Sequence, residues 1–275
     1  MRTLLVLARI SNLPTVWSNC LAAWVLAGGG AWARFGLLCL GATLLYTGGM
    51  FLNDAVDQAF DRRYRPERPI VAGQISSLTV WILSCVWLVG GWMVLFWLGR
   101  AAMIVGSLLL LTIIFYDLVH KHTLLAPVLM AGCRFLLYLA AAAAAARSQV
   151  WPVWRPALAL AAYIIGLSYL ARGESTGGKS VRWPMLLLLG PALAATVAPA
   201  GAGWSVWIVL AVQIGWTLWC ICGRGAVLWV PRGVAGLLAG IVFVDWLAAV
   251  GQGFTGVFVG LFFLAVLLQR LAPAT

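Results

Sequence analysis

The sequence predicts an all-α, polytopic membrane protein that forms one transmembrane domain over residues 1–275. Two observations carry this prediction. Hydrophobic residues make up 64% of the 275-residue chain and charged residues only 9%, which is not the composition of a soluble domain. Apolar runs of about 20 residues, the length with which a helix crosses a bilayer, also recur from one end of the chain to the other. The chain is therefore expected to cross the membrane many times.

The apolar runs predict nine or ten transmembrane helices in a single bundle. In chain order, the expected spans are residues 13–29, 35–53, 77–98, 101–117, 125–146, 156–171, 184–199, 204–222, 232–250 and 253–270. Only Gly251, Gln252 and Gly253 separate the last two spans, which leaves the count at nine or ten. Glycines four residues apart at 236–240 and 256–260 form two GxxxG patterns, and each pattern predicts close packing against a neighbouring helix.

The residues before the first span are interpreted as an amphipathic lead-in helix over 1–12. A cleaved signal peptide is the alternative, because Arg2 precedes an apolar stretch. Arg9, Asn12 and Pro14 interrupt that stretch, whereas a signal peptide needs an unbroken apolar region. The lead-in helix is therefore favoured.

Basic residues assign the two sides of the membrane. If the N-terminus is cytoplasmic, 13 of the 18 lysines and arginines fall in cytoplasmic segments, as the positive-inside rule requires. These are Arg2, Arg9, Arg62, Arg63, Arg65, Arg68, Lys121, Arg172, Lys179, Arg182, Arg224, Arg232 and Arg270. The outer segments hold only Arg34, Arg100, Arg147 and Arg155. The expected location is a bacterial inner membrane, and anionic lipid headgroups account for the net charge of +11 without a nucleic-acid partner.

The most informative segment is Gly49–Ser76, which holds four of the seven acidic residues in the chain: Asp54, Asp57, Asp61 and Glu67. Steps of three and four residues place the aspartates on one face of a helix. Like charges on one face repel each other, and carboxylates near a helix C-terminus oppose the helix dipole. A compensating positive charge is therefore expected.

Two sources of that positive charge are open. Arg62, Arg63, Arg65 and Arg68 follow the aspartates, so the segment is either a charged loop that neutralises itself or part of a cation site. Carboxylates without histidine or cysteine favour Mg²⁺ over Zn²⁺. Because Mg²⁺ fills its coordination shell with water and substrate phosphate, acids beside arginines at a membrane surface indicate a diphosphate ligand.

Two further cytoplasmic loops carry candidate phosphate contacts. His120 and Lys121 lie between the fourth and fifth spans, on the same side as the aspartates. The loop from Arg172 to Ser180 holds Glu174 and Lys179 and matches the P-loop pattern. A P-loop requires a preceding strand and a following helix, so the loop is interpreted as a glycine-rich turn beside the same mouth.

Two charged residues lie inside predicted spans, where ionisable side chains are functional or paired. Arg134, with Tyr138 one turn further on, is expected either to line a cavity or to pair with a carboxylate or carbonyl. For Asp245 a pairing role is favoured, and the sequence identifies no partner for it.

The aspartate segment resembles the first aspartate-rich motif of the UbiA superfamily of intramembrane prenyltransferases. The resemblance rests on Asn53-Asp54-x-x-Asp57-x-x-x-Asp61, Arg65-Pro66-Glu67-Arg68-Pro69, Gly73-Gln74-Ile75-Ser76, and on Tyr116, His120, Lys121 and Thr123. It extends over essentially the entire chain and implies a UbiA-like bundle of nine or ten helices around a central cavity with a cytoplasmic cap. The run Ser168–Ser175 is similar to the EboC-like branch of the superfamily.

The resemblance also implies an activity. A polyprenyl diphosphate binds with Mg²⁺ as cofactor, ionises to an allylic cation and alkylates an aromatic or other small acceptor. Asn53, Asp54, Asp57 and Asp61 are the implied catalytic residues, and the three aspartates hold the metal. The implied diphosphate contacts are Arg65, Arg68, His120, Lys121, Glu174 and Lys179. The implied partners are the prenyl diphosphate, the acceptor and membrane lipid.

One departure from the family pattern keeps a second function open. The family's second aspartate-rich motif supplies several acids, whereas the corresponding segment here offers only Glu174, next to Arg172. His120 also replaces the usual lysine. The alternative is therefore a UbiA-like membrane protein that binds or escorts a lipid diphosphate or precursor without turning it over. An unrelated transporter would be favoured by an inverted repeat, which the sequence does not display.

Overall fold

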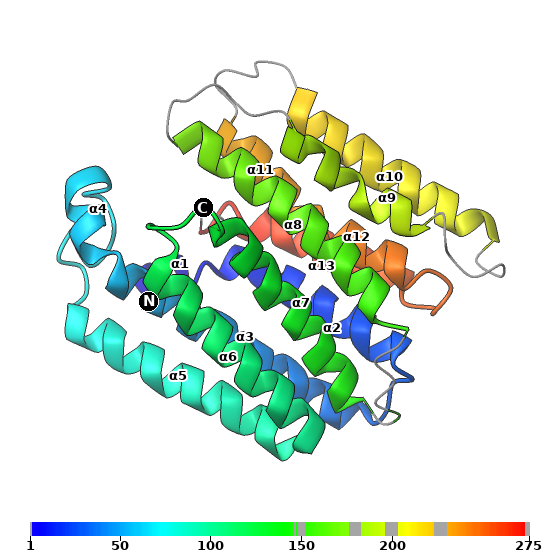
Figure 1. Cartoon of the computed structure of the whole chain (residues 1–275), viewed down its shortest axis with the longest axis horizontal. Coiled ribbons are helices and arrows are strands. Elements are labelled where there is room, and N and C mark those ends of the chain that lie inside the picture. Colours follow the sequence, from blue (N-terminus) through cyan, green and yellow to red (C-terminus); the bar gives the residue numbers. More distant parts are fainter. Residues whose placement is uncertain are drawn as a thin grey trace.

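The computed structural model describes residues 2–145, 147, 152–175, 183–195, 203–222 and 230–272. Every regular element in these ranges is a helix, and the helices pack side by side into one bundle (Figure 1). The predicted all-α class is therefore confirmed. In Figure 1, α5 (Ser77–Trp97) forms one edge of the bundle and α10 (Gly203–Cys222) lies at the opposite edge.

The remaining elements follow in chain order. They are α1 (Arg2–Leu7), the 3-10 helix η1 (Ile10–Asn12), α2 (Leu13–Leu26), α3 (Trp32–Val56), α4 (Gln58–Tyr64), α6 (Arg100–Val119), α7 (Ala126–Ala144), α8 (Trp154–Ser175), the 3-10 helix η2 (Trp183–Leu189), α9 (Gly190–Ala195), α11 (Val230–Ala239), α12 (Ile241–Ala248) and α13 (Thr255–Leu268). Each predicted span coincides with one or two of these elements.

Six of the described helices are long and apolar enough to cross a bilayer: α3, α5, α6, α7, the segment Trp154–Ala171 of α8, and α10. Shorter apolar helices cover Met185–Ala195, Gly233–Ala248 and Thr255–Leu268. The chain is thus an integral, multi-pass membrane protein. The described residues do not decide between nine and ten spans, partly because the expected span 184–199 is described only as far as residue 195.

Three expected boundaries differ in the structure. The lead-in helix ends at Leu7 and is followed by a turn at Arg9. The span expected to end at residue 53 continues to Val56. The span expected at 232–250 is divided at Gly240, where the Tyr163 hydroxyl donates a hydrogen bond to the backbone carbonyl of Leu237, at 2.9 Å. A side chain that inserts into the backbone hydrogen-bond ladder is a recognised cause of such a break.

Small residues bring the helices close together. A Cβ atom at Gly91 of α5 would lie 2.8 Å from both the backbone oxygen of Gly41 and the backbone nitrogen of Leu45 in α3. Six consecutive alanines, Ala140 to Ala145, do the same at the end of α7, where all six are buried. Close approach of backbones is how membrane helices gain packing energy, since lipid is as apolar as the side chains.

The two GxxxG patterns have different outcomes. A Cβ atom at Gly236 would lie 2.6 Å from the Cys220 sulfur, so the predicted close packing is confirmed there. Gly256 and Gly260 meet no atom within 4 Å among the described residues. The prediction is therefore wrong for this second pair, which lies on a face of α13 that no described helix covers.

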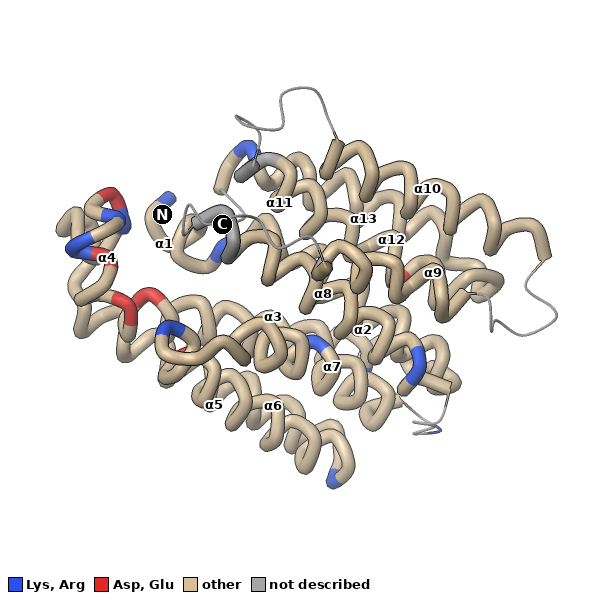
Figure 2. Tube along the Cα trace, turned by 45° about the horizontal axis from the view of Figure 1, so that its top comes forward, with Lys and Arg blue, Asp and Glu red and all other residues tan. Residues whose placement is uncertain are grey.

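The densest group of charged residues lies at one end of the bundle, around α1 and α4 (Figure 2). The aspartate cluster lies at this end, where α3 leaves the membrane. Asp245 is the exception, because it is buried in α12 within the bundle.

The contact between α3 and α5 yields a stability prediction with an adjacent control. Gly91→Ala should lower the stability of the protein by roughly 1–3 kcal/mol, because the added methyl group meets backbone atoms that have no room to move. Gly90→Ala places its methyl group 3.8 Å from Leu44, so it should be neutral or slightly stabilising, as alanine is the better helix former. Thermal unfolding in detergent measures both. Equal effects of the two substitutions would contradict the packing described here.

Candidate active site at the mouth of the cavity

The end of α3 brings three polar side chains to one place. Backbone hydrogen bonds continue from Asp57 to Asn53, from Asp61 to Asp57 and from Arg65 to Asp61, each from an amide to the carbonyl four residues earlier. The chain therefore keeps its helical phase through the junction of α3 and α4. Asp54, Asp57 and Asp61 are only 4%, 7% and 3% exposed, so the expected common face exists and is buried.

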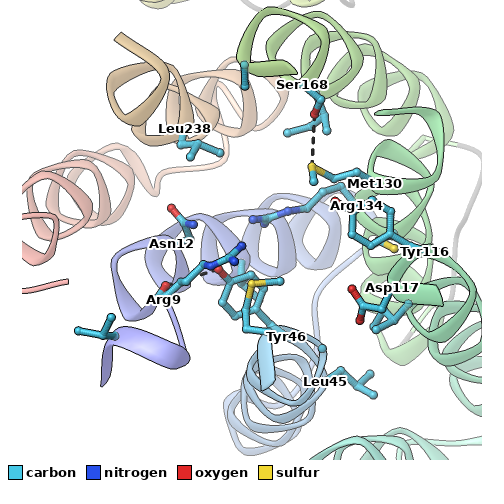
Figure 3. A pocket seen from close by; sticks show the side chains of 18 of the residues that line it. Arg9, Asn12, Leu45, Tyr46, Tyr116, Asp117, Met130, Arg134, Ser168 and Leu238 are labelled. Carbon is cyan, nitrogen blue, oxygen red and sulfur yellow. Dashed lines mark hydrogen bonds between the residues drawn. The ribbon is translucent and has the colours of Figure 1, made fainter. Parts of the chain in front are cut away.

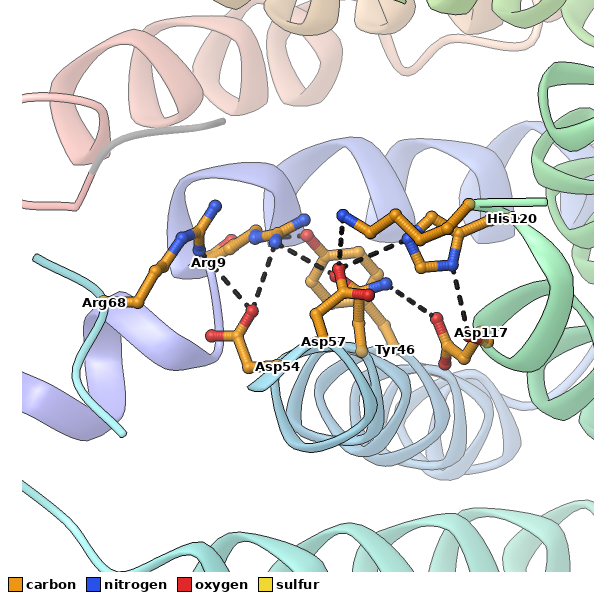
Figure 4. Close-up of polar contacts among 9 residues, drawn as sticks. Arg9, Tyr46, Asp54, Asp57, Arg68, Asp117 and His120 are labelled. Atoms are coloured by element: carbon orange, nitrogen blue, oxygen red, sulfur yellow. Dashed lines mark hydrogen bonds and ion pairs between the residues drawn. The ribbon is translucent and has the colours of Figure 1, made fainter. Parts of the chain in front are cut away.

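Asp54 is neutralised by two arginines from distant parts of the sequence. The Oδ1 atom of Asp54 lies 3.4 Å from Arg9 Nη2 and 3.5 Å from Arg68 Nη1 (Figure 4). Arg9 also donates to Asn53 Oδ1, at 3.3 Å. Because both arginines share Oδ1, the buried Oδ2 atom of Asp54 has no hydrogen-bond partner among the described residues.

Arg9 adopts an unusual backbone conformation. Its φ angle is +43°, in the left-handed region that residues other than glycine rarely adopt. Non-glycine residues in this conformation cost of order 1–3 kcal/mol and are concentrated at functional sites. The turn between α1 and η1 directs the guanidinium toward Asn53 and Asp54 (Figure 4).

Asp57 is held by the connection between α6 and α7. Its Oδ2 atom lies 2.9 Å from Lys121 Nζ and 3.3 Å from His120 Nε2. The other ring nitrogen of His120 lies 3.1 Å from the backbone oxygen of Asp117. Burial acts to raise the pKa of Asp57, but the hydrogen bonds from His120 and Lys121 outweigh it and lower the pKa below its ordinary value. Asp57 is therefore ionised.

Two further carboxylates lie beside these pairs. Asp117 is 2% exposed and its Oδ1 atom accepts a hydrogen bond from Asn53 Nδ2, at 3.0 Å. Asp61 forms no ion pair with any described residue, and burial raises its pKa above the ordinary value. One oxygen of each, Asp117 Oδ2 and Asp61 Oδ1, is buried without a hydrogen-bond partner in the described part of the chain.

The residues present fit a hard cation that is completed by a ligand. Within the described ranges, no three carboxylate, histidine or cysteine side chains lie close enough to hold an ion by themselves. Mg²⁺ does not need such a cage, because it takes one or two carboxylates and fills its shell with water and phosphate oxygens. The buried, unpartnered oxygens of Asp54 and Asp61 are donors of the required kind.

The cluster borders a cavity of about 870 Å³ that extends into the bundle. At its mouth lie Arg2, Arg9, Arg65, Glu67 and Arg68, and Asp117 and Tyr116 line its wall. Figure 3 shows Arg9, Tyr46, Tyr116 and Asp117 around the opening. Further in, the wall is mainly apolar and includes Leu45, Ile113, Leu137, Ile164, Leu167 and Leu238. The cavity therefore joins an ionic mouth to an apolar interior.

The structure brings most of the predicted site residues together. Asp54 contacts Arg68, and Asp57 contacts His120 and Lys121. Asn53 joins the cluster through Arg9 and Asp117, and Asp61 is buried on the same face. Arg65 lines the mouth of the cavity, whereas Arg62 and Arg63 are exposed. Within the segment, Arg68 neutralises Asp54, whereas the basic partners of Asp57 come from outside it. The Glu174 side chain and Lys179 lie outside the described residues.

Sequence reasoning overlooked three residues of the site: Arg9, Asp117 and Tyr46. Arg9 was used only to assign the side of the membrane and to argue against a signal peptide. The signal that marks it is a charge that interrupts the apolar lead-in shortly before a proline. Asp117 is an acid at the end of a span whose next turn holds His120 and Lys121. Tyr46 carries no such signal, and only the fold places it below Arg9, where its hydroxyl donates to the Arg9 carbonyl oxygen, at 3.4 Å.

Fold and site together define a multi-pass membrane protein whose buried carboxylates and basic side chains close one end of an apolar cavity. The UbiA prenyltransferase family model matches residues 11–238. This chain belongs to the UbiA prenyltransferase family, and the resemblance inferred from its motifs is confirmed.

Solved structures of similar fold agree with this assignment. One, from work on digeranylgeranylglyceryl phosphate synthase, has a TM-score of 0.66 at 17% identity and covers 91% of this chain and 97% of its own. A UbiA homologue from Archaeoglobus fulgidus, bound to GPP and Mg²⁺, has a TM-score of 0.57 at 10% identity and covers 98% of both chains. At these identities, the likeness establishes the fold alone.

Two curated relatives are also similar in sequence, one over a short stretch and one over most of the chain. A 4-hydroxybenzoate octaprenyltransferase from Cupriavidus necator is 35% identical over 71 residues, which are 25% of this chain and 25% of that protein. The match thus spans a quarter of that relative. Another 4-hydroxybenzoate octaprenyltransferase, from Acidovorax ebreus, is 25% identical over 228 residues, which are 74% of this chain and 78% of that protein.

The contact between Arg9 and Asp54 predicts a coupling that a double-mutant cycle measures. In buffer with a metal chelator, Arg9→Gln should destabilise the protein because Asp54 keeps only the longer contact to Arg68. Asp54→Asn removes the charge that Arg9 compensates. The double variant should therefore be less destabilised than the sum of the single variants, by roughly 1 kcal/mol or more. Additive effects would show that Arg9 does not stabilise this carboxylate.

Proposed function

We propose that this chain is a Mg²⁺-dependent intramembrane prenyltransferase that transfers a prenyl group from a polyprenyl diphosphate to an aromatic or other small acceptor. One observation carries the proposal: two buried carboxylates, each held by two basic side chains, lie where an ionic mouth meets an apolar cavity. A lipid diphosphate likewise combines an anionic head group with an apolar chain. The family membership and the GPP and Mg²⁺ present in a homologue of this fold support it.

Under this proposal, the site residues divide into two groups. Asn53, Asp54, Asp57 and Asp61 form the catalytic group, and the three aspartates hold the metal. The diphosphate contacts are Arg65, Arg68, His120, Lys121, Glu174 and Lys179. Bound Mg²⁺ supplies positive charge that stabilises the departing diphosphate. The same domain, residues 1–275, supplies both the charged mouth and the prenyl cavity.

The basic side chains change partners in this proposal. Arg68 and Lys121 each contact a carboxylate at 3.5 and 2.9 Å in the structure. With a metal diphosphate bound, the carboxylates would hold the metal and the basic side chains would be free to donate to phosphate oxygens. Charge-assisted hydrogen bonds of this kind stabilise negative charge as it develops on the leaving group.

The reaction balances without a redox partner. The bond between prenyl C1 and the diphosphate oxygen breaks, and the diphosphate leaves with the electron pair. The resulting allylic cation forms a carbon–carbon bond with the acceptor, whose reacting carbon then loses a proton. The apolar wall of the cavity, with Ile113, Leu137 and Leu238, excludes water that would otherwise capture the cation.

Binding without turnover is the competing function, and a specific observation favours it. The segment at the end of α8 that corresponds to a second acidic motif offers one acid, Glu174. A site with half the usual carboxylates retains affinity for a metal diphosphate more readily than it retains the charge stabilisation that ionisation requires. Diphosphate release separates the two functions.

The direct test uses purified protein in lipid nanodiscs with Mg²⁺ and geranyl, farnesyl and longer diphosphates. Wild type should bind the diphosphates only with Mg²⁺ and release inorganic diphosphate when an acceptor extract is added. Asp57→Asn and Asp54→Asn should lower release by about 100-fold or more, since several kcal/mol of charge stabilisation is lost.

Arg62→Gln is the control, because Arg62 is exposed on α4, the short helix that follows Asp57, and its substitution also removes one formal charge, of the opposite sign. It should behave as wild type. Mg²⁺-dependent binding with equal background release by wild type and Asp57→Asn would favour the binding protein. Loss of Mg²⁺-dependent binding itself would refute both functions.

We propose that the mouth of the cavity faces the cytoplasm of a bacterium, with the protein in the inner membrane. The support is the concentration of basic residues at the end of the bundle that carries α1 and α4 (Figure 2). A cysteine-free background with Arg62→Cys or Arg100→Cys tests it, since α4 and the start of α6 lie at opposite ends. A membrane-impermeant maleimide should label position 100 in intact spheroplasts and position 62 only in inverted vesicles. The reverse labelling pattern would show that the mouth of the cavity faces the opposite side of the membrane.

A further inference from the structure

A second pocket lies at the end of the bundle opposite the mouth. This arginine pocket has a volume of about 370 Å³ and is lined by Arg34 of α3, Arg100 of α6 and residues where α5 and α7 end. Arg34 lies in the first turn of α3 and Asp54 in its last, and about 20 residues of helix span about 30 Å, the thickness of a bilayer core. The arginine pocket therefore belongs to the opposite membrane surface, and none of the roles proposed above uses it.

The guanidinium of Arg34 is held in place but only partly satisfied. Its Nη2 atom donates to the backbone oxygens of Leu98, at 2.6 Å, and of Ala144, at 3.2 Å. These bonds join the start of α3 to the ends of α5 and α7. The Nε atom of Arg34 is buried and has no hydrogen-bond partner among the described residues. Because a buried donor without a partner is costly, and more so on a charged group, an acceptor from outside the chain is expected.

The described residues supply no carboxylate that balances the arginine pocket. Neither Arg34 nor Arg100 forms an ion pair within the described ranges, and Figure 2 shows no acidic residue of the described chain where α5 ends and α6 begins. Both arginines lie in the first turn of a helix, where the helix dipole is positive and favours an anion. Two uncompensated cations therefore line one pocket.

Charged side chains inside the bundle are, by contrast, satisfied by their neighbours. Arg134 donates to Asn19 at 2.7 Å. Asp245 accepts hydrogen bonds from three neutral donors, Ser18, Asn19 and Tyr138. The pairing expected for Asp245 is therefore with hydroxyl and amide groups. The arginine pocket has no side-chain network of this kind in the part of the chain that the structure describes.

Exposed tryptophans place the arginine pocket at the level of the lipid headgroups. Trp32, the first residue of α3, is 55% exposed, and Trp97, the last residue of α5, is 78% exposed. Leu98, which follows Trp97, lines the pocket itself. Tryptophan at the ends of membrane helices marks the interface between hydrocarbon and water. The anions present at that level in a bilayer are the phosphates of its lipids.

We propose that the arginine pocket binds the phosphate of an anionic phospholipid in the leaflet opposite the mouth. Arg34 presents its Nε and Nη atoms as a planar fork, which matches two oxygens of a phosphate. Arg100, which is exposed, adds a second positive charge and favours headgroups that carry no ammonium group. The bound lipid connects the start of α3 with the start of α6. This site does not depend on the proposed activity.

The test measures which lipid occupies the arginine pocket. A bimane label on Trp97→Cys, in a cysteine-free background, lies beside the pocket, and brominated lipids quench its fluorescence on contact. In nanodiscs of unbrominated phosphatidylcholine, brominated phosphatidylglycerol is compared with brominated phosphatidylcholine at the same mole fraction. The protein with both arginines should prefer phosphatidylglycerol by about fivefold or more, as expected for arginines beside an anionic headgroup.

Substitutions in the same labelled protein separate this pocket from other basic surfaces. Arg34→Gln and Arg100→Gln should each lower the preference for phosphatidylglycerol by about fivefold, the contribution of one arginine. Arg155→Gln is the matched control, because Arg155 is also exposed in the first turn of a helix, α8, and does not line the pocket. It should keep the full preference.

Three results would overturn the assignment. The first is equal quenching by the two brominated lipids in the protein with both arginines. The second is a full preference for phosphatidylglycerol in either Arg34→Gln or Arg100→Gln. Because Arg100 is exposed, its substitution keeps the test decisive even if Arg34→Gln fails to fold. The third is displacement of phosphatidylglycerol by millimolar inorganic phosphate, which would show a site for the free anion instead of a lipid.

Discussion

The structure depends on one electrostatic constraint: carboxylates buried at a membrane surface require positive charges placed within reach. Asp54 and Asp57 are nearly inaccessible to solvent, and removal of carboxylates from water is costly unless they are paired. Three separate segments meet this demand. Arg9 comes from the turn before η1, Arg68 from the loop after α4, and His120 with Lys121 from the connection between α6 and α7. The cluster thereby fixes how four segments of the chain meet at the mouth of the cavity.

The same arrangement recurs deeper in the bundle with the signs reversed. At the mouth, each carboxylate contacts its cations directly. The Arg134 guanidinium lines the cavity, and its counter-charge, Asp245, does not contact it directly. The side-chain amide of Asn19 lies between them and hydrogen-bonds to both. Direct pairing keeps charges in balance until a ligand replaces one partner, whereas indirect pairing leaves a charge available to a ligand. The cavity thus has paired carboxylates at its mouth and a guanidinium deeper in its wall.

The sequence was sufficient for features that arise within one helix. The common face of Asp54, Asp57 and Asp61 follows from the helical period alone, and the apolar runs predict the spans because bilayer thickness sets their length. Contacts between segments far apart in the chain could not be predicted from the sequence. Arg9 reaches Asp54 across 45 positions through a left-handed turn that the residue type disfavours. Gly236 is closely packed and Gly256 meets no atom of the described residues within 4 Å, a difference that likewise depends on which helices become neighbours.

The central claim is that the basic side chains at the mouth exchange aspartate for phosphate when a metal diphosphate binds. Electron paramagnetic resonance of Mn²⁺, with geranyl S-thiolodiphosphate in nanodiscs, measures this directly through the magnetic coupling between the metal and phosphorus. The account predicts weak Mn²⁺ binding without the diphosphate and tight binding with it, together with phosphorus coupling that Asp54→Asn and Asp57→Asn remove. Equal Mn²⁺ affinity with and without the diphosphate, or bound Mn²⁺ without phosphorus coupling, would contradict it.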